Sequence, residues 1–192
     1  MNANDVQQLF NRLGRFAEKI KVKKGDGYQW DYTFPDGVET TYILRNIRNL
    51  NEIEDEITSY FIWVWNLKDY LKELSKFIGR DPKEIESFVN SDNSLTICAD
   101  IANRLKHGDL NKSRSSLFPT LGKLNLSLTK EHLSSITFSG KEIKFDISKP
   151  NEIELTIPVY DNDGKEVGDG FKFLDAAISS WEKCFSNLIT SR

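Results

Sequence analysis

The sequence predicts an α+β protein: a helical bundle with an N-terminal β-hairpin and an antiparallel β-meander inserted before the C-terminal helix. Apolar residues recur at helical spacing over 4–22, 53–105 and 173–190. Between residues 121 and 160 they instead alternate with polar residues, as in a half-buried sheet. A separate alternating segment at 28–44 surrounds a Pro-Asp-Gly turn. Helices followed by strands and a closing helix favour the α+β class.

The first two predicted elements are an amphipathic helix over 4–22 and a β-hairpin over 28–44. In the hairpin, aromatic residues alternate along the first arm and Val38, Thr40, Tyr42 and Leu44 along the second. A helix starting near Glu39 is the alternative for the second arm, since helical spacing also runs onward from it.

A long helix is predicted from about residue 51 to 78. Its apolar residues alternate steps of three and four, as in the seam of a helical bundle: Ile53, Ile57, Tyr60, Val64, Leu67, Leu71, Leu74 and Ile78. A second stripe contains Ile62, Trp65 and Asp69. We expect this stripe to lie either at the centre of the bundle or against a partner.

The remaining elements follow from local signals. Asp81-Pro82 starts a short helix, and the next helix covers 94–107, with a cap in the Ser91–Ser94 turn and Gly108 after its end. Asp161 to Gly164 form a hairpin turn, since the glutamate that would complete a calcium loop is absent. We expect a single domain over 1–192, with the bundle at 1–114 and 171–192 and the meander at 120–168.

Composition narrows the class of protein. The chain has 192 residues, a net charge of −3, 39% hydrophobic and 29% charged residues, which is typical of one soluble domain. The slightly negative net charge argues against a protein that binds nucleic acid through an overall basic surface. No apolar run is long enough to span a membrane. Cys98 and Cys184 lie on apolar helical faces, so we expect buried thiols in a cytoplasmic protein without zinc or another cofactor.

The stretch over 100–114 is the best candidate for a functional site. On a helical wheel, Asp100, Asn103, Arg104 and His107 lie opposite the apolar sector and form two i, i+4 pairs. Lys106, Lys112 and Arg114 add positive charge. A histidine flanked by cations can hold a phosphate or move a proton beside one. The alternative is a solvated helix end whose basic residues complement the helix dipole.

Asp69 is a second candidate for binding. It lies on the largely apolar long helix, where a carboxylate needs a partner. Arg104, Lys106 or His107 would supply one if the two helices pack side by side. An exposed acid paired with Lys72 or Lys76 is the alternative.

A bundle with an Asp-x-x-Asn-Arg-x-Lys-His segment late in its third main helix resembles the HEPN superfamily. Residues 48–114 carry this resemblance, and they are also similar to uncharacterised bacterial proteins that share a Leu-Lys-Asp-aromatic segment, here Leu67 to Tyr70. The resemblance implies a bacterial defence or toxin-type system, homodimerisation, and metal-independent RNase chemistry with Arg104 and His107 as catalytic residues. Only two residues separate these two, whereas the family pattern has four to six.

Two functions follow from these observations. The first is a non-catalytic or weakly catalytic HEPN-like module that binds a protein partner, or a nucleic-acid or nucleotide ligand, through the 100–114 segment. The alternative is a homodimeric RNase in which His107 is the general acid or base and Arg104 stabilises charge on the phosphate. The shortened arginine–histidine spacing and the low net basicity favour the binding module.

Overall fold

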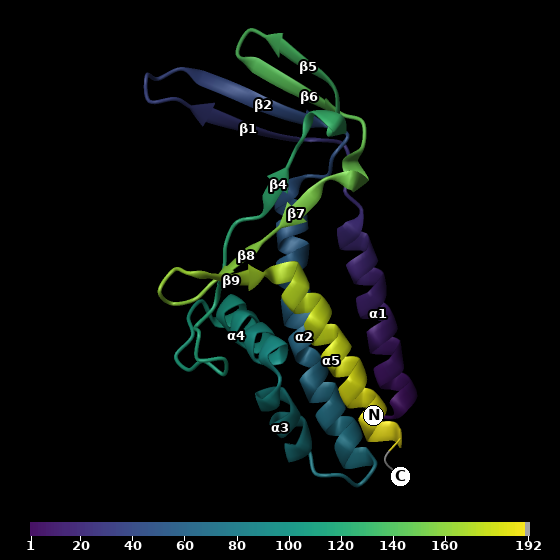
Figure 1. Ribbon diagram of the computed structural model, residues 1–192. Helices are drawn as coiled ribbons and strands as arrows, with labels where there is room; N and C mark the ends of the chain where they lie inside the picture. Colours follow the sequence, from purple (N-terminus) through teal and green to yellow (C-terminus); the bar gives the residue numbers. More distant parts are fainter. Residues whose placement is uncertain (191–192) are drawn as a thin grey trace. The chain divides into compact units, whose positions relative to one another are not determined.

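The computed structural model describes residues 1–190, and within them the protein has an α+β fold (Figure 1). Its helices are α1 (Ala3–Lys21), α2 (Leu50–Phe77), α3 (Lys83–Ser91), α4 (Asn93–His107) and α5 (Gly170–Thr190). Its strands are β1 (Tyr28–Thr33), β2 (Glu39–Arg45), β3 (Thr120–Leu121), β4 (Asn125–Ser127), β5 (Leu133–Ser139), β6 (Glu142–Ile147), β7 (Glu154–Thr156), β8 (Pro158–Tyr160) and β9 (Glu166–Asp169). Short 3-10 turns, η1 (Lys130–His132) and η2 (Pro150–Glu152), flank the β5–β6 pair.

The chain forms two compact units, and the division falls within α1 and α2. The helical unit contains residues 1–17, 57–123 and the described chain from 156 onward. The sheet unit contains residues 18–56 and 124–155. The segment 28–44, expected as an appendage of the bundle, therefore belongs with strands from the second half of the chain.

The core of the helical unit is built from the predicted seams of α2 and α5. Seam residues from Ile57 to Leu74 are buried, as are Trp181 and most of its apolar neighbours on α5. Phe10 on α1 contacts Phe185 on α5, with ring centroids 5.6 Å apart. In Figure 1, α1, α2 and α5 lie side by side. None of the described helices is long and apolar enough to cross a membrane.

Both cysteines are buried free thiols within this helical core, as the sequence predicts. Burial raises the pKa of both thiols, that of Cys184 to about 11. The Cys98 thiol donates to the carbonyl of Phe173 over 3.6 Å. Such thiols are packing groups rather than nucleophiles.

Of the two tryptophans on the long helix α2, only Trp63 is exposed. Trp65, assigned to a stripe that faces the bundle centre or a partner, is only 5% exposed, whereas Trp63 is 51% exposed. The ring of Trp65 is covered by Lys68 and Arg114, whose charged groups lie 4.5 and 5.3 Å from its centroid. Trp65 is therefore not available to a partner.

The sheet unit is organised around a four-stranded sheet with the order β1-β2-β6-β5. The pairs β1–β2 and β5–β6 are antiparallel, and β2 and β6 join them in parallel, with Tyr42 opposite Ile143 and Leu44 opposite Phe145. Beneath one end of the sheet, Leu44, Ile47, Ile147 and Ile153 form a small buried cluster.

Two sequence expectations about strands are wrong. The segment 120–168 is not one antiparallel meander: β6 pairs with β2, β4 pairs with β7, and β3-β8-β9 form a separate antiparallel sheet. Alternation identifies a strand but not its neighbour, which is decided by packing over long sequence distances. The alternative helix from Glu39 is also wrong, since these residues form β2.

Truncation of Trp181 tests the helical core. We expect Trp181→Ala to lower the free energy of unfolding by about 3–5 kcal/mol, because it leaves a cavity at a fully buried position. Trp63→Ala, at an exposed position on α2, is the matched control and should change it by less than about 1 kcal/mol. Urea denaturation followed by circular dichroism measures both, and equal losses would contradict the core as described.

Candidate functional site

The predicted site begins on α4, a helix that is capped at both ends, by Asp92 and by Gly108. The Asp92 carboxylate accepts hydrogen bonds from Leu95 N at 3.0 Å and from the hydroxyls of Ser94 and Ser180 at 2.5 Å each. Burial alone would raise the pKa of Asp92, but these hydrogen bonds outweigh it and lower that pKa. At the other end, Gly108 adopts φ = 79° and its N–H donates to Arg104 O at 2.7 Å, as expected for a glycine C-cap.

Asp100 is fully buried rather than exposed on a polar helix face. Its Oδ2 accepts from Ser113 Oγ at 2.6 Å and from Ser115 N and Oγ at 2.9 and 2.7 Å. Its Oδ1 accepts from Arg114 N at 2.8 Å. The expected pairing of Asp100 with Arg104 is wrong, because the loop after α4 folds back and supplies all four donors.

Arg104 holds a later part of the same loop. Its Nε and Nη2 donate to the carbonyls of Pro119 and Phe118 at 3.2 and 3.3 Å, and Nη1 lies 3.7 Å from the Asp109 carboxylate. Phe118 has φ = 49°, a conformation uncommon for a side chain of this size. The guanidinium predicted to contact phosphate is thus engaged by the backbone of its own chain.

The end of α4 is the more open part of the site. Lys106 and His107 are exposed and Asn103 is half-buried. Lys106 Nζ donates to Asn66 Oδ1 on α2 at 2.7 Å. Within the described chain, His107 and Asn103 form no side-chain hydrogen bond, so Asn103 does not orient the imidazole.

Arg114 connects the loop to α2 and α3. Its guanidinium lies 3.1 Å from the Glu86 carboxylate, donates to Asn90 Oδ1 at 3.0 Å and covers the ring of Trp65. Glu86 also accepts from Lys72 at 2.9 Å. Burial would raise the pKa of Glu86, but Lys72 and Arg114 outweigh it and lower that pKa. Lys112, on the same loop, is exposed.

Asp69 does not join this site. Its carboxylate is exposed and lies 3.4 Å from Lys68, its neighbour in sequence. The expected contact with Arg104, Lys106 or His107 is wrong, since Lys106 reaches Asn66 instead. The alternative pairing with Lys72 or Lys76 is wrong as well, because those lysines pair with Glu86 and Glu73.

The residues that sequence reasoning missed are Ser113 and Ser115, which bind the buried carboxylate. The run Ser113-Arg114-Ser115-Ser116 is a local signal for side-chain hydrogen bonding, but it does not identify a distant acceptor. The chemistry of the site is therefore that of a loop fastened at two points, Asp100 and Arg104, which presents Lys112 and Arg114.

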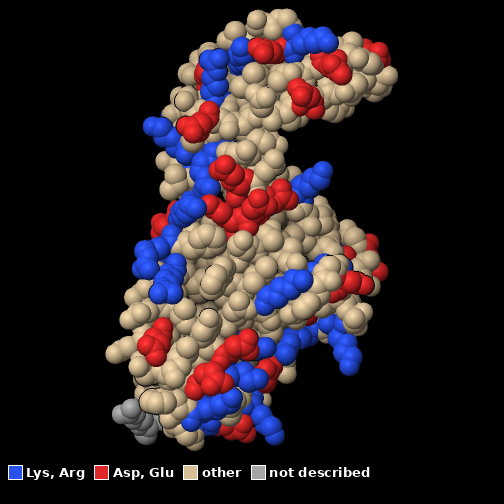
Figure 2. All heavy atoms as spheres, turned by 180° about the vertical axis from the view of Figure 1, so that it is seen from behind, with Lys and Arg blue, Asp and Glu red and all other residues tan. Residues whose placement is uncertain are grey.

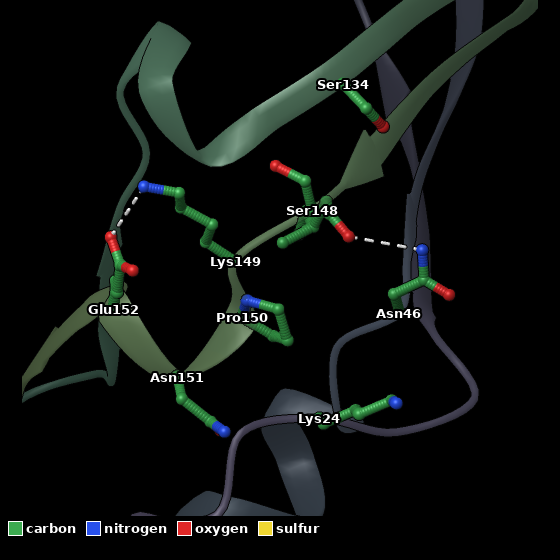
Figure 3. A pocket seen from close by; sticks show the side chains of 9 residues that line it. Lys24, Asn46, Ser134, Ser148, Lys149, Pro150, Asn151 and Glu152 are labelled. Carbon is green, nitrogen blue, oxygen red and sulfur yellow. Dashed lines mark hydrogen bonds and ion pairs between the residues drawn. The ribbon is translucent and has the colours of Figure 1, made fainter.

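The sheet unit contains a polar hollow of about 540 Å³ (Figure 3). Asn46, which adopts φ = 64°, donates to the carbonyl of Ile147 at 3.1 Å, and Lys149 pairs with Glu152 at 3.2 Å. Figure 3 shows the Lys24 and Asn151 side chains reaching the rim from separate segments. No sequence pattern predicts this hollow, whose lining is mostly polar.

Within residues 1–190, no group of three or more His, Cys, Asp or Glu side chains is placed to hold a metal ion. Comparison with protein-family models, with curated proteins and with solved structures finds no match.

Replacing one acceptor oxygen of Asp100 tests whether this residue holds the loop after α4 in place. In Asp100→Asn, the side-chain NH₂ must face a donor of the loop, and we expect the free energy of unfolding to fall by about 2–3 kcal/mol. Asp69→Asn, at an exposed acid, is the control and should change it by less than about 0.5 kcal/mol. Urea unfolding gives both values, while hydrogen exchange at Arg114 N and Ser115 N shows whether the loop opens. Unchanged stability and exchange would contradict the anchor.

Proposed function

We propose that the protein is a non-catalytic, HEPN-like binding module of a bacterial defence or toxin-type system, and that it binds an acidic surface of a protein partner. The observation that carries this proposal is the loop that exposes Lys112 and holds Arg114, whose side chain stays 31% exposed while it pairs with Glu86. Asp100 fixes the loop backbone with four hydrogen bonds, and Glu86 and Asn90 hold the Arg114 guanidinium, so this group is positioned before a partner arrives. A preorganised surface loses less conformational entropy on binding.

Binding is better supported than catalysis because the Arg104 guanidinium is already hydrogen-bonded within its own chain. Stabilising a phosphate would require its guanidinium to leave the carbonyls of Phe118 and Pro119. His107 lies at the end of the same helix, without a described side chain that holds its imidazole in one orientation. A general acid or base needs such positioning.

A protein partner is better supported than a nucleic acid because the charges are mixed. Around Trp65, the cations Lys68, Lys72 and Arg114 surround the carboxylate of Glu86. Figure 2 shows a similar mixture over one face of the molecule, with Asp and Glu interspersed among Lys and Arg. Nucleic-acid sites usually present a basic stripe, whereas protein contacts combine both signs.

Charge reversal on the loop tests the proposal. We expect the double variant Lys112→Glu with Arg114→Glu to bind the partner at least tenfold more weakly, since two attractions become repulsions. The variant Lys172→Glu with Lys183→Glu changes the same charge at exposed positions of α5 and should retain binding. Proteins captured from bacterial extract by each form are quantified, and the retained protein is then purified and titrated at two salt concentrations.

Two outcomes would contradict this proposal. Equal retention by the loop variant and the control would place the contact elsewhere. Recovery of nucleic acid by the wild type, lost only in the loop variant, would replace the protein ligand by RNA or DNA.

The exposure of His107 beside Lys106 favours one other candidate, a metal-independent RNase. If the non-catalytic proposal is correct, wild type and His107→Ala incubated in EDTA with structured and single-stranded RNAs leave them equally intact. Gel analysis of the RNA measures this. Cleavage by wild type alone would establish the RNase and place His107 in its chemistry.

A further inference from the structure

The four-stranded sheet of the sheet unit has one face made of aromatic and aliphatic side chains, which we call the aromatic face. Side chains alternate along a strand, and residues opposite each other in the register share a face. Tyr28, Trp30 and Tyr32 on β1 therefore lie on the same face as Tyr42 on β2, Phe145 on β6 and Phe138 on β5. Within the four described strands, no Lys, Arg, Asp or Glu lies on this face.

The opposite face of the same sheet carries the charges. Asp31 accepts from Thr41 Oγ1 at 2.6 Å, and Asp146 accepts from Ser135 Oγ at 2.6 Å and lies 3.5 Å from Arg45. Such a polar face suits contact with water. The distribution of polar residues thus marks the aromatic face as the side of the sheet that is built to be covered.

Much of the aromatic face is nevertheless open. Phe138 is 74% exposed and Tyr32 is 48% exposed, and Trp30, Phe34 and Ile136 are each more than a third exposed. Soluble proteins rarely leave aromatic residues together in water unless another surface covers them.

The rings on this face are already ordered. Trp30 is stacked between Tyr28 and Tyr42, with centroids 5.6 and 5.1 Å away and interplanar angles of 26° and 13°. Tyr32 and Phe34 make an edge contact at 4.8 Å. Rings fixed by their neighbours lose little freedom when a partner covers them, which favours association.

The aromatic face also combines a projection with a hollow. Phe138 and Ile136 stand out at the β5 edge, and a hollow of about 500 Å³ is lined by Trp30, Tyr42, Leu126 and other apolar residues. In a two-fold symmetric contact, a projection on each copy must fit a recess on the other. One face that carries both satisfies this condition.

We infer that a second copy of this chain covers the aromatic face, with the two sheets packed face to face. The exposed parts of Trp30, Tyr32, Phe34, Ile136 and Phe138 offer roughly 500 Å² on each copy, taking about 200 Å² for a whole side chain. Two copies thus bury on the order of 1,000 Å², the size from which specific interfaces begin. The half-buried neighbours add to this area.

Charge permits a second copy on this face and disfavours a nucleic acid. The whole chain carries only −3, so the net repulsion between two copies is small. The aromatic face adds nothing to it, because within the four strands neither copy presents a charged group there. A nucleic acid would find no cation to pair with its phosphates.

The oligomeric state of the full chain tests this inference. We expect a dimer for the wild type in sedimentation equilibrium, and at least a tenfold higher dissociation constant for Phe138→Glu, which buries a carboxylate in the contact. Thr137→Glu is the matched control: it changes the neighbouring residue of β5 on the charged face, opposite Lys144, and should leave the dimer intact. Tyr32→Glu provides a second disruption on β1, and circular dichroism establishes that each variant is folded.

A monomeric wild type at the highest soluble concentration would overturn the inference, and so would a dimer that both Phe138→Glu and Tyr32→Glu leave unchanged. These results are independent of the proposed function, since the loop variant Lys112→Glu with Arg114→Glu alters the helical unit alone. Loss of dimerisation in Thr137→Glu as well would also count against the aromatic face as the specific contact.

Discussion

The helical unit depends on a single buried carboxylate. Asp100 is fully buried, and a buried polar group is stable only when it is hydrogen-bonded. Three residues of one loop supply all four donors, so the loop cannot move away without leaving buried oxygen acceptors unsatisfied. The position of Arg114, over the ring of Trp65 and beside Glu86, follows from that constraint.

The sequence predicted what depends on local pattern. Three features could be identified because each depends only on residues close together in the sequence: the seam of α2, the buried face of α5 and the glycine cap of α4. The pairing of strands was not, since β2 and β6 have the same alternation as strands that end in other sheets. Periodicity determines which face of a strand is apolar, whereas its neighbour is selected by the whole chain.

At the candidate site, the polar face of α4 could be predicted from the sequence, but the loop that packs on this face could not. The helical wheel correctly separated Asp100 and Arg104 from the residues packed on α5. It then left that face to a functional site or to solvent, because no spacing rule encodes that the loop directly after α4 folds back to cover it. The sequence left open whether Trp65 faces the bundle or a partner, because the side chain that covers its ring comes from Arg114, nearly fifty residues later. A polar helix face can thus serve to receive a loop.

The parallel pairing of β2 with β6 has a consequence for synthesis of the chain on the ribosome. The β1–β2 pair is complete once residue 45 has emerged, but β6 begins only at residue 142. At roughly 5–20 residues per second, about 5–20 s pass before β6 covers the open edge of β2. During that interval the nascent chain presents both an unpaired strand and a row of aromatic rings. It is therefore a natural client for chaperones that shield growing polypeptides.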